Sequence, residues 1–522
     1  MKKNIKKILW VDDEIDQLQA HILFLKEKGY EIIPAANGDD AVVLVGNQDF
    51  HLVLLDEMMP GKDGLTTLEE IKEIKPSLPV VMVTKSEEEH LMEEAIGKKI
   101  DDYLTKPVNP SQILSVIKKI LDTKKIRGDH LTQQYIKDFS QISMMLSGPM
   151  NWKDWQDLAL KLAKRETEIE NYPDLGLKQT LQGQNQECNS EFGRYIERNY
   201  PTWMKSDDRP TLSVDIVRKY LTPLLIEGPQ PVVFIVIDCM RLDQWLVIEE
   251  LLSEYFNIST DLYYSILPTA TPYSRNAIFS GLFPEEFIKL IPEGWKSGPD
   301  DDVSLNRNER QLFDKQLLGL NMKFKTESKY VKVIDQSEGE NILKKLDNYL
   351  QTPVLSIVYN FIDNLAHGRS ESEILQEIAP DEAAFRSLMK SWFIHSPLFT
   401  VLRELSNRKC NVIITTDHGS ILGVKGTTAY GRKDTSTNLR YKYGDNLNCD
   451  TKHAVLLKDP SQYRLPYFTG HTTYIIAREN YYFIYPTKFN EYQRYYQNSF
   501  QHGGISIEEM ILPVATLKSR QL

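Results

Sequence analysis

The chain has 522 residues, of which 41% are hydrophobic and 26% are charged, a balance typical of a folded protein rather than a disordered one. Its formal net charge of −11 argues against a protein that coats nucleic acid, because such a protein needs a basic face. The four cysteines have no C-x-x-C spacing, and the longest clean apolar run, Val232–Ile237, is too short to cross a bilayer. We therefore expect a cytoplasmic protein without membrane insertion, long enough for about three or four domains.

Residues 1–122 alternate short apolar segments with amphipathic ones. The expected strands are Ile8–Val11, Glu31–Ala35, Leu52–Leu55, Val80–Thr84 and Asp102–Leu104. Amphipathic segments such as Asp16–Lys28 and Pro110–Leu121 are the expected helices. This alternation predicts βα units with a parallel sheet that is covered on both faces.

Polar side chains follow successive strands of this first domain. Asp12 and Asp13 come after the first strand, Asp56 ends the third, Thr84 ends the fourth and Lys106 follows the fifth. Because the carboxyl ends of parallel strands meet at one crevice, the three carboxylates predict a Mg²⁺ site there. A carboxylate beside Mg²⁺ can attack a phosphoryl donor, and a lysine and a threonine can bind the new phosphoryl oxygens.

At these residues the segment resembles a response-regulator receiver domain. The resemblance implies that a sensor histidine kinase phosphorylates Asp56. The residues that it assigns to Mg²⁺ are Asp12, Asp13, Asp56 and Met58 through its carbonyl, and those that it assigns to the conformational switch are Thr84, Tyr103 and Lys106. Phosphorylation would change the face around the last strand, and a self-complementary face would then form a homodimer.

Residues 123–208 carry helical periodicity without strand signals. The expected helices are Asp129–Leu146, Asn151–Glu170 and Asn189–Tyr200. Breaks at Ser147–Pro149 and at Tyr172–Pro173 separate them. We expect a helical connector domain here.

From residue 209 to residue 522 the βα alternation resumes. Buried strands are expected at Val232–Ile237, Val354–Phe361 and Val412–Thr416, and two long irregular insertions at Glu285–Tyr330 and Gly423–Gln462. The predicted fold class is thus α/β multidomain, with a (βα)5 receiver domain, a helical connector and a large α/β domain with insertions. This last part is far larger than a DNA-reading module and has neither a basic recognition helix nor a P-loop.

Seven side chains of the large domain have metal-binding or nucleophilic chemistry and stand mostly at strand ends: Asp238, Thr271, Asp363, His367, Asp417, His418 and His502. Imidazole with carboxylate suits Zn²⁺, and Mn²⁺ is an alternative where oxygen dominates. Seven groups are too many for one tetrahedral ion but suffice for two ions that clamp an in-line phosphoryl displacement. Metal coordination would activate the hydroxyl of Thr271, which is the expected nucleophile.

In this order these residues resemble the alkaline phosphatase superfamily, and the segments Thr271–Arg275 and His502–Glu509 are most similar to its PglZ branch. The resemblance implies that Asp363, His367 and His502 hold one zinc ion and that Asp238, Asp417, His418 and Thr271 hold the other. A receiver, a helical connector and a PglZ domain together are similar to PorX-type response regulators. That likeness implies kinase-driven activation and a role in type IX secretion.

The sequence also offers candidates for substrate binding: Arg241, Arg275, Lys425, Arg432 and Arg440. The segment Lys425–Gly444 interleaves basic residues with tyrosines, a pattern typical of proteins that bind a single-stranded nucleotide chain. A solvated loop explains the same pattern equally well. We expect a phosphodiesterase that acts on oligonucleotides or cyclic nucleotides.

An alternative function belongs to another class. The chain would then be a signalling scaffold that binds a transcription factor or a sigma factor and carries a structural metal site. Thr271 favours the enzyme, because a scaffold has no use for an activated nucleophile.

Overall fold

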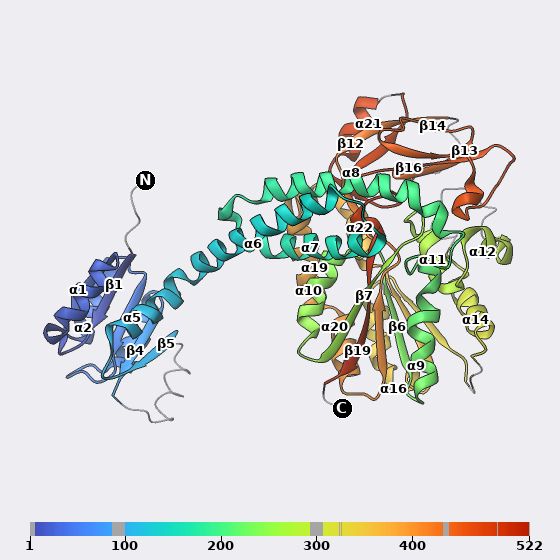
Figure 1. Ribbon diagram of the computed structural model, residues 1–522. Coiled ribbons are helices and arrows are strands. Elements are labelled where there is room, and N and C mark those ends of the chain that lie inside the picture. Colours follow the sequence, from blue (N-terminus) through green and yellow to red (C-terminus); the bar gives the residue numbers. More distant parts are fainter. Residues whose placement is uncertain are drawn as a thin grey trace. The chain divides into compact units, whose positions relative to one another are not determined.

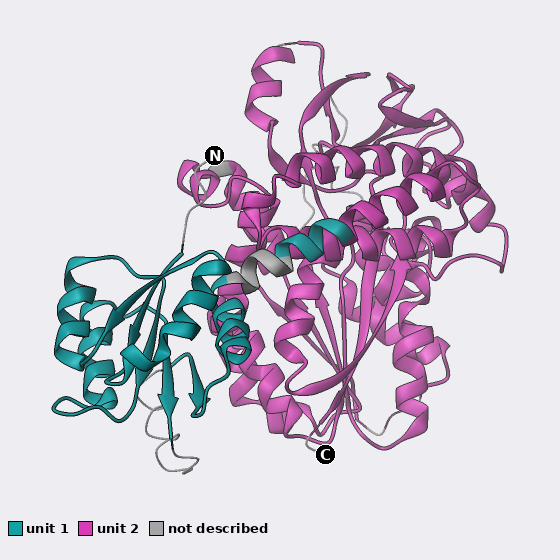
Figure 2. Ribbon diagram, turned by 60° about the vertical axis from the view of Figure 1, so that its left-hand side comes forward, with its two compact units in different colours: residues 1–133 teal, residues 134–522 magenta. Residues whose placement is uncertain are grey.

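The computed structural model describes residues 6–85, 100–292, 306–322, 324, 326–431, 438–487 and 489–520. The chain divides into two compact units, 1–133 and 134–522, which Figure 2 shows in different colours. The described residues of the first unit form one sheet, and those of the second form a large sheet and several small ones. No helix among the described residues combines the length and the apolar character that a bilayer crossing requires.

A parallel sheet of five strands organises the first unit, in the order β2-β1-β3-β4-β5. Its strands are β1 (Lys6–Val11), β2 (Tyr30–Ala35), β3 (Leu52–Asp56), β4 (Val80–Thr84) and β5 (Asp102–Thr105). Its helices are α1 (Gln19–Glu27), α2 (Gly38–Asn47), α3 (Gly64–Ile74) and α5 (Pro110–Ile117). The predicted βα alternation is confirmed, and every predicted strand is present.

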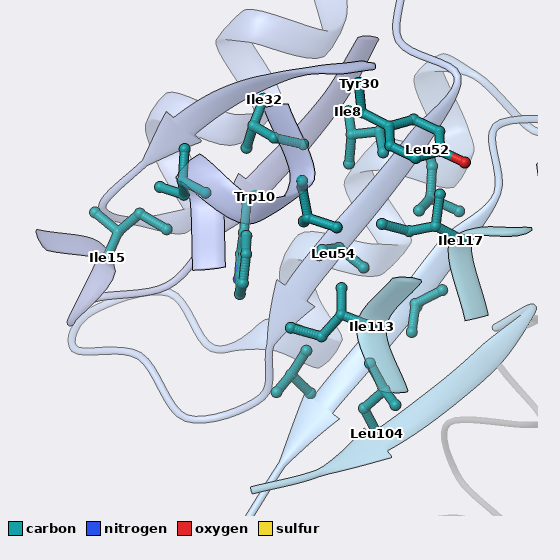
Figure 3. Close-up of a cluster of buried hydrophobic side chains, with 14 residues drawn as sticks. Ile8, Trp10, Ile15, Tyr30, Ile32, Leu52, Leu54, Leu104, Ile113 and Ile117 are labelled. Carbon is teal, nitrogen blue, oxygen red and sulfur yellow. The ribbon is translucent and has the colours of Figure 1, made fainter. Parts of the chain in front are cut away.

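Both faces of this sheet are buried, because successive side chains of a strand point in opposite directions. Ile8 and Trp10 of β1 belong to a cluster that includes Ile113 of α5 (Figure 3). Their neighbours Leu9 and Val11 belong to a second cluster with residues of α2 and α3. Packing therefore occupies the two faces, and functional groups are left to the edge where the strands end.

Three long helices follow: α6 (Thr123–Leu146), α7 (Trp152–Ile169) and α8 (Lys178–Trp203). The predicted helices of residues 129–146 and 151–170 are confirmed. Helix α8 begins at Lys178, earlier than the predicted start at Asn189. The prediction missed its first turns because residues 178–187 are mostly polar and show no apolar periodicity.

The large sheet of the second unit has six strands in the order β7-β19-β10-β6-β9-β8. Strands β10, β6, β9 and β8 are parallel, and β19 runs antiparallel to both of its neighbours. The strands are β6 (Val232–Ile237), β7 (Phe256–Tyr264), β8 (Lys329–Val333), β9 (Val354–Tyr359), β10 (Asn411–Thr415) and β19 (Ile511–Ser519). The three buried strands expected from the sequence are β6, β9 and β10.

Helices cover both faces of this second sheet (Figure 1). Phe234 of β6 packs against Phe279 of α11 and Phe313 of α14 on one face, and α10 and α20 lie on the other. The helices of the second unit after α8 are α9 (Thr222–Glu227), α10 (Leu242–Leu252), α11 (Thr271–Ser280), α12 (Pro284–Leu290), α14 (Glu309–Gly319), α15 (Gln336–Lys344), α16 (Leu346–Tyr349), α17 (Phe361–Glu371), α18 (Glu373–Ile378), α19 (Glu382–His395), α20 (Pro397–Ser406), α21 (Phe489–Tyr496) and α22 (Ile507–Met510).

The prediction of an irregular insertion at Gly423–Gln462 is wrong. This stretch belongs to small sheets formed by β11 (Ile421–Gly423), β12 (Lys425–Tyr430), β13 (Tyr441–Asp445), β14 (Asn448–Cys449), β15 (Ala454–Leu457), β16 (Thr472–Ala477), β17 (Tyr481–Ile484) and β18 (Ser499–Gln501). The strands are short and carry polar side chains, but Leu447, Ile475 and Phe483 belong to a separate hydrophobic core of these small sheets. The other expected insertion contains α14, and residues 293–305 lie outside the described part.

Candidate functional site

Three carboxylates converge at the end of the first sheet. Asp12 and Asp13 follow β1 and Asp56 ends β3, and one oxygen of each lies within 4.8 Å of the others. Asp12 and Asp56 are buried, whereas Asp13 is exposed. Burial raises the pKa of Asp56, and Lys106 opposes that rise. Oxygen ligands with one side open to water fit Mg²⁺, which retains several waters when it binds protein.

The other predicted receiver residues surround this carboxylate group. Lys106 Nζ lies 2.9 Å from Oδ2 of each buried aspartate. Thr84 is buried at the end of β4, and its carbonyl accepts a hydrogen bond from the backbone N–H of Lys106 at 2.7 Å. The side chains of Tyr103 and Met58 are 42% and 66% exposed. The structure thus brings Lys106 to the carboxylates, places Thr84 beside Lys106 and leaves Tyr103 at the surface.

Gly64 is a residue of this site that the sequence analysis missed. A Cβ atom there would lie 2.3 Å from the carbonyl oxygen of Asp56 and 2.7 Å from Cα of Glu57. The N–H of Gly64 also donates to the carbonyl of Glu57 at 2.9 Å. Only glycine lets α3 begin so close to Asp56, and the one signal in the sequence was that Gly64 is the second of two glycines that follow Pro60.

In the second unit, Asp238, Asp417 and His418 form a group that we call the enclosed cluster. Asp238 follows β6 and the other two follow β10, the neighbouring parallel strand, so all three leave the sheet at one edge. Their ligand atoms lie within 4.8 Å of one another, and all three residues are at most 1% exposed. Such a group fits a single divalent ion.

Thr271, the expected nucleophile, contacts this cluster. Its Oγ1 lies 2.9 Å from Nε2 of His418, and the residue is 6% exposed. Nδ1 of His418 lies 3.0 Å from the carbonyl of Gly419, which only accepts, so Nδ1 carries the proton and Nε2 presents its lone pair. Burial lowers the pKa of His418, which keeps the ring neutral.

Asp363, His367 and His502 form a second group, which we call the open cluster. Asp363 and His367 stand at i,i+4 on α17, as predicted, and His367 Nε2 lies 3.4 Å from Asp363 Oδ1. His502 Nε2 lies 3.7 Å from the same oxygen. The His367 side chain is 61% exposed, so solvent reaches this cluster.

The chemistry of both clusters fits bound divalent metal. Oδ1 of Asp238, Oδ1 of Asp363 and Oδ2 of Asp417 are buried and accept no hydrogen bond from the described residues. Buried carboxylate oxygens without donors are costly, and a cation removes that cost. Burial, followed by the charge of Asp238, raises the pKa of Asp417 well above its usual value, as expected for buried acids that lie close together.

Arg275 does not occupy the substrate-binding place that was predicted for it. Its Nη1 lies 2.5 Å from Oδ2 of Asp238, its Nε lies 2.6 Å from Oε1 of Glu309, and it is 1% exposed. The guanidinium therefore fixes the position of the Asp238 carboxylate of the enclosed cluster. The sequence analysis missed Glu309 as a partner of Arg275, because it lies in a stretch that was expected to be irregular. Glu309 also accepts a hydrogen bond from the hydroxyl of Tyr330.

Arg241 and Arg440 likewise form ion pairs with buried acids, which makes them unavailable to a substrate. Arg241 donates from Nε and Nη2 to the two oxygens of Asp243 at 2.8 and 3.0 Å. Arg440 donates from Nε and Nη2 to the two oxygens of Glu509 at 3.1 and 2.5 Å. Both arginines are at most 2% exposed, so their predicted role in substrate binding is not supported.

The remaining substrate candidates lie in or near β12. Lys425 Nζ lies 5.5 Å from the ring centre of Tyr481, and Tyr430 is 53% exposed. Arg432 lies outside the described residues. Tyr441 is buried against Tyr273, so the predicted basic and aromatic stretch is not one continuous surface.

Three consecutive stretches of the chain match known families. Residues 8–118 match the response regulator receiver domain, residues 125–204 the PorX response regulator linker domain, and residues 216–517 the BREX system PglZ alkaline phosphatase-like domain. The last match covers more than half of the chain. The chain belongs to the PglZ family.

Its receiver and linker make this PglZ family member a PorX-type response regulator, so the resemblance seen in the sequence is confirmed. The receiver domain implies phosphorylation by a histidine kinase. The PglZ domain relates the second unit to the alkaline phosphatase superfamily of phosphoesterases.

Individual relatives match the receiver domain. The transcriptional regulatory protein ResD of Bacillus subtilis is 36% identical over 118 residues, which are 23% of this chain and 49% of ResD. The alkaline phosphatase synthesis transcriptional regulatory protein PhoP of the same organism is 32% identical over 123 residues, 23% of this chain and 50% of PhoP. The match thus spans about half the length of these curated relatives.

Two solved structures are similar to the same part. A CheY-like receiver domain protein from Methanospirillum hungatei is 32% identical and covers 23% of this chain and 95% of that chain, with a TM-score of 0.22. The response regulator TrrA from Thermotoga maritima, in complex with Mg²⁺ and BeF, is 32% identical and covers 22% of this chain and 100% of that chain, with a TM-score of 0.21.

Proposed function

We propose that this PglZ family member is a cytoplasmic response regulator whose output is the zinc-dependent hydrolysis of phosphodiesters. The observation that carries the proposal is the 2.9 Å contact between Thr271 Oγ1 and His418 Nε2, which sets a buried hydroxyl against the enclosed cluster. The ring of His502 stacks on that of His418, so the open cluster lies next to the enclosed one. A hydroxyl beside two metal-binding groups is the arrangement that phosphoryl displacement needs.

Each cluster has the donors for one ion. Asp363, His367 and His502 would hold one zinc ion, and Asp238, Asp417, His418 and the hydroxyl of Thr271 would hold the other. When bound, the two ions would lower the pKa of the hydroxyl and neutralise charge on the phosphoryl oxygens.

The fold positions Thr271 for attack. Helix α11 begins at this residue, with Pro272 in its first turn, so the hydroxyl lies where backbone N–H groups have no partner within the helix. These groups favour an anion at the same place. Thr271 thus presents its oxygen at the point where the phosphoryl group would bind.

The charges around the site favour a diester over a monoester. A terminal phosphate carries two negative charges and gains from a free guanidinium, whereas a diester carries one. Arg241, Arg275 and Arg440 are all paired with buried acids, so none of them is available to a second phosphate charge.

For the substrate we propose linear oligonucleotides or cyclic nucleotides. Lys425 lies over the ring of Tyr481, and Tyr430 exposes half of its side chain on the same strand. Basic and aromatic groups of this kind bind the phosphates and the bases of a nucleotide chain.

Control of the activity is assigned to the receiver domain. We propose that a sensor histidine kinase phosphorylates Asp56, with Mg²⁺ held by Asp12, Asp13, Asp56 and the carbonyl of Met58. Phosphorylation would then change the positions of the Thr84 and Tyr103 side chains and produce a homodimer. The process that the protein regulates would be type IX secretion.

Hydrolysis by the full-length, zinc-loaded protein tests the proposal. We expect bis(p-nitrophenyl) phosphate to be cleaved faster than p-nitrophenyl phosphate. Thr271→Ser should retain activity because it keeps a hydroxyl, and Thr271→Ala should lose about a hundredfold or more. A faster monoester reaction would refute the diester preference. Normal signalling by Thr271→Ala in cells would instead support a scaffold that binds a transcription factor or a sigma factor.

A further inference from the structure

Helix α8 of the linker domain reaches the catalytic part of the second unit at two points. Asn189, which is 4% exposed, accepts a hydrogen bond from the N–H of Ile507 at 2.8 Å and donates to both carboxylate oxygens of Glu508 at 3.0 Å. The hydroxyl oxygen of Tyr200 accepts a hydrogen bond from the N–H of Leu267 at 3.0 Å. The two side chains are eleven residues apart, close to three helical turns, so they leave α8 on one face.

The segment held by Asn189 is joined to the metal-binding residues. The carbonyl of Glu509 accepts a hydrogen bond from the N–H of Gly419, the residue after His418, at 3.2 Å. A Cβ atom on Gly419 would lie 1.9 Å from the carbonyl oxygen of Glu508, so the two backbones are in direct contact. The turn at 507–509, which is part of α22, therefore sets the position of the loop that carries Asp417 and His418 of the enclosed cluster.

The same turn also fixes the open cluster. Oε1 of Glu509 accepts a hydrogen bond from the N–H of Gly504 at 2.8 Å, two residues after His502. The N–H of Glu509 donates to Ser506 Oγ at 3.1 Å, which keeps the turn closed. One short turn thus contacts segments of both clusters, and Asn189 holds that turn.

The segment held by Tyr200 leads to the nucleophile. Leu267 stands four residues before Thr271. Between them, Thr269 Oγ1 donates to the carbonyl of Gly504 at 2.8 Å and accepts from the N–H of Gly503 at 3.2 Å. Tyr200 therefore holds the loop between β7 and α11, which leads to Thr271 at the start of α11.

Both contacts use the polar chemistry of the side chain fully. An amide offers a donor and an acceptor at once, and Asn189 uses the acceptor on a backbone N–H and the donor on the half-buried carboxylate of Glu508. Tyr200 is fully buried, and its hydroxyl oxygen satisfies the N–H of Leu267 at a position where water does not reach. Neither contact is needed to build the linker helices themselves.

We propose that Asn189 and Tyr200 are positioning residues, through which linker helix α8 holds the turn at 507–509 and the segment at 267–271 in the geometry that hydrolysis requires. The expected effect on hydrolysis rests on the proposed function. The linker is then part of the active site's support rather than a tether, and any shift of α8 changes both segments together.

Two variants of the full-length protein test the proposal against matched controls. Asn189→Leu keeps the volume and removes both hydrogen bonds, and its control is Gln184→Leu, a buried amide on α8 that donates to Phe139 O at 3.4 Å instead. Tyr200→Phe removes one oxygen, and its control is Tyr482→Phe, whose buried hydroxyl donates to Gln493 O at 2.8 Å.

We expect Asn189→Leu to lower kcat for the diester about tenfold or more with little change in KM, because displaced catalytic groups lose transition-state contacts. Tyr200→Phe should lower kcat about threefold to tenfold, the loss that corresponds to one buried hydrogen bond. Both controls should stay within about twofold of wild type.

A second measurement does not require activity. Cobalt(II) bound in place of zinc absorbs visible light according to its ligand geometry, so Asn189→Leu and Tyr200→Phe should shift the spectrum while the controls leave it unchanged. Unchanged kcat and unchanged spectra in both variants would overturn the inference. Tyr200→Phe keeps the packing of the ring, so it decides the matter if Asn189→Leu does not fold. If wild type cleaves no ester, the proposed function fails, and the cobalt spectra still test α8.

Discussion

The rings of His418 and His502 stack with their centres 4.2 Å apart and their planes 18° apart, although the two residues are 84 positions apart in the chain. His418 belongs to the enclosed cluster and His502 to the open cluster. The stack therefore brings the two clusters side by side. Two ions held in this way would bind the same phosphoryl group, whereas ions at two distant sites would not.

Replacing Arg275 by methionine should destabilise the metal-free protein. The change leaves Asp238 and Glu309 buried without their cation, which costs about 3–5 kcal/mol in similar buried pairs. Urea unfolding of metal-free protein measures this loss. Arg310→Met is the matched control, because Arg310 is 55% exposed and its closest carboxylate oxygen is 3.7 Å away, so its loss should cost less than about 1 kcal/mol. Equal stability losses for the two variants would contradict the role given to Arg275.

The stability of the protein should fall as pH rises through neutrality, because of Glu166. Burial, with the charge of Glu382 next in size, raises the pKa of Glu166 from 4.5 to about 8. Between these values the folded state holds a proton that the unfolded state has released, so the free energy of unfolding decreases with pH by at most about 1.4 kcal/mol per unit.

Glu166→Gln tests this pH dependence, since glutamine does not titrate. Unfolding by urea at several pH values from 5 to 8 should show a shallower slope for the variant than for wild type. Glu168→Gln on the same helix changes an exposed glutamate and should keep the wild-type slope. A wild-type slope in Glu166→Gln would show that another group is responsible.

Asp56 should be the phosphoryl acceptor of the receiver domain. Incubation with Mg²⁺ and acetyl phosphate is expected to add one phosphoryl group to wild type, and mass spectrometry should find none on Asp56→Asn. Asp49→Asn, which changes a 98% exposed aspartate of the same domain, should label normally. Light scattering with beryllofluoride should show the mass doubling in wild type only, and an unchanged mass there would argue against the homodimer.

The strands and the candidate site were predictable from the sequence because their signals are local. Buried strands such as Val232–Ile237 are continuous apolar runs, and Asp238 and Asp417 directly follow such runs. Topology then brings the carboxyl ends of parallel strands to one edge. The i,i+4 spacing of Asp363 and His367 is also visible in the sequence alone.

The partners of the buried arginines were not predictable. Arg275 and Arg440 find their acids at Glu309 and Glu509, in other elements far along the chain, and no sequence pattern marks such pairs. The small sheets of residues 421–501 were missed for a related reason, since their short strands pair with segments distant in sequence. Long-range pairing overrides local composition in both cases.

The location of zinc tests the central claim most directly. Anomalous scattering measured at the zinc absorption edge, on crystals of the zinc-loaded protein, is expected to give two peaks in the second unit. One peak should lie among Asp238, Asp417, His418 and Thr271, and the other among Asp363, His367 and His502. Peaks elsewhere, or a single peak that leaves either cluster without metal under saturating zinc, would contradict the two-metal phosphodiesterase.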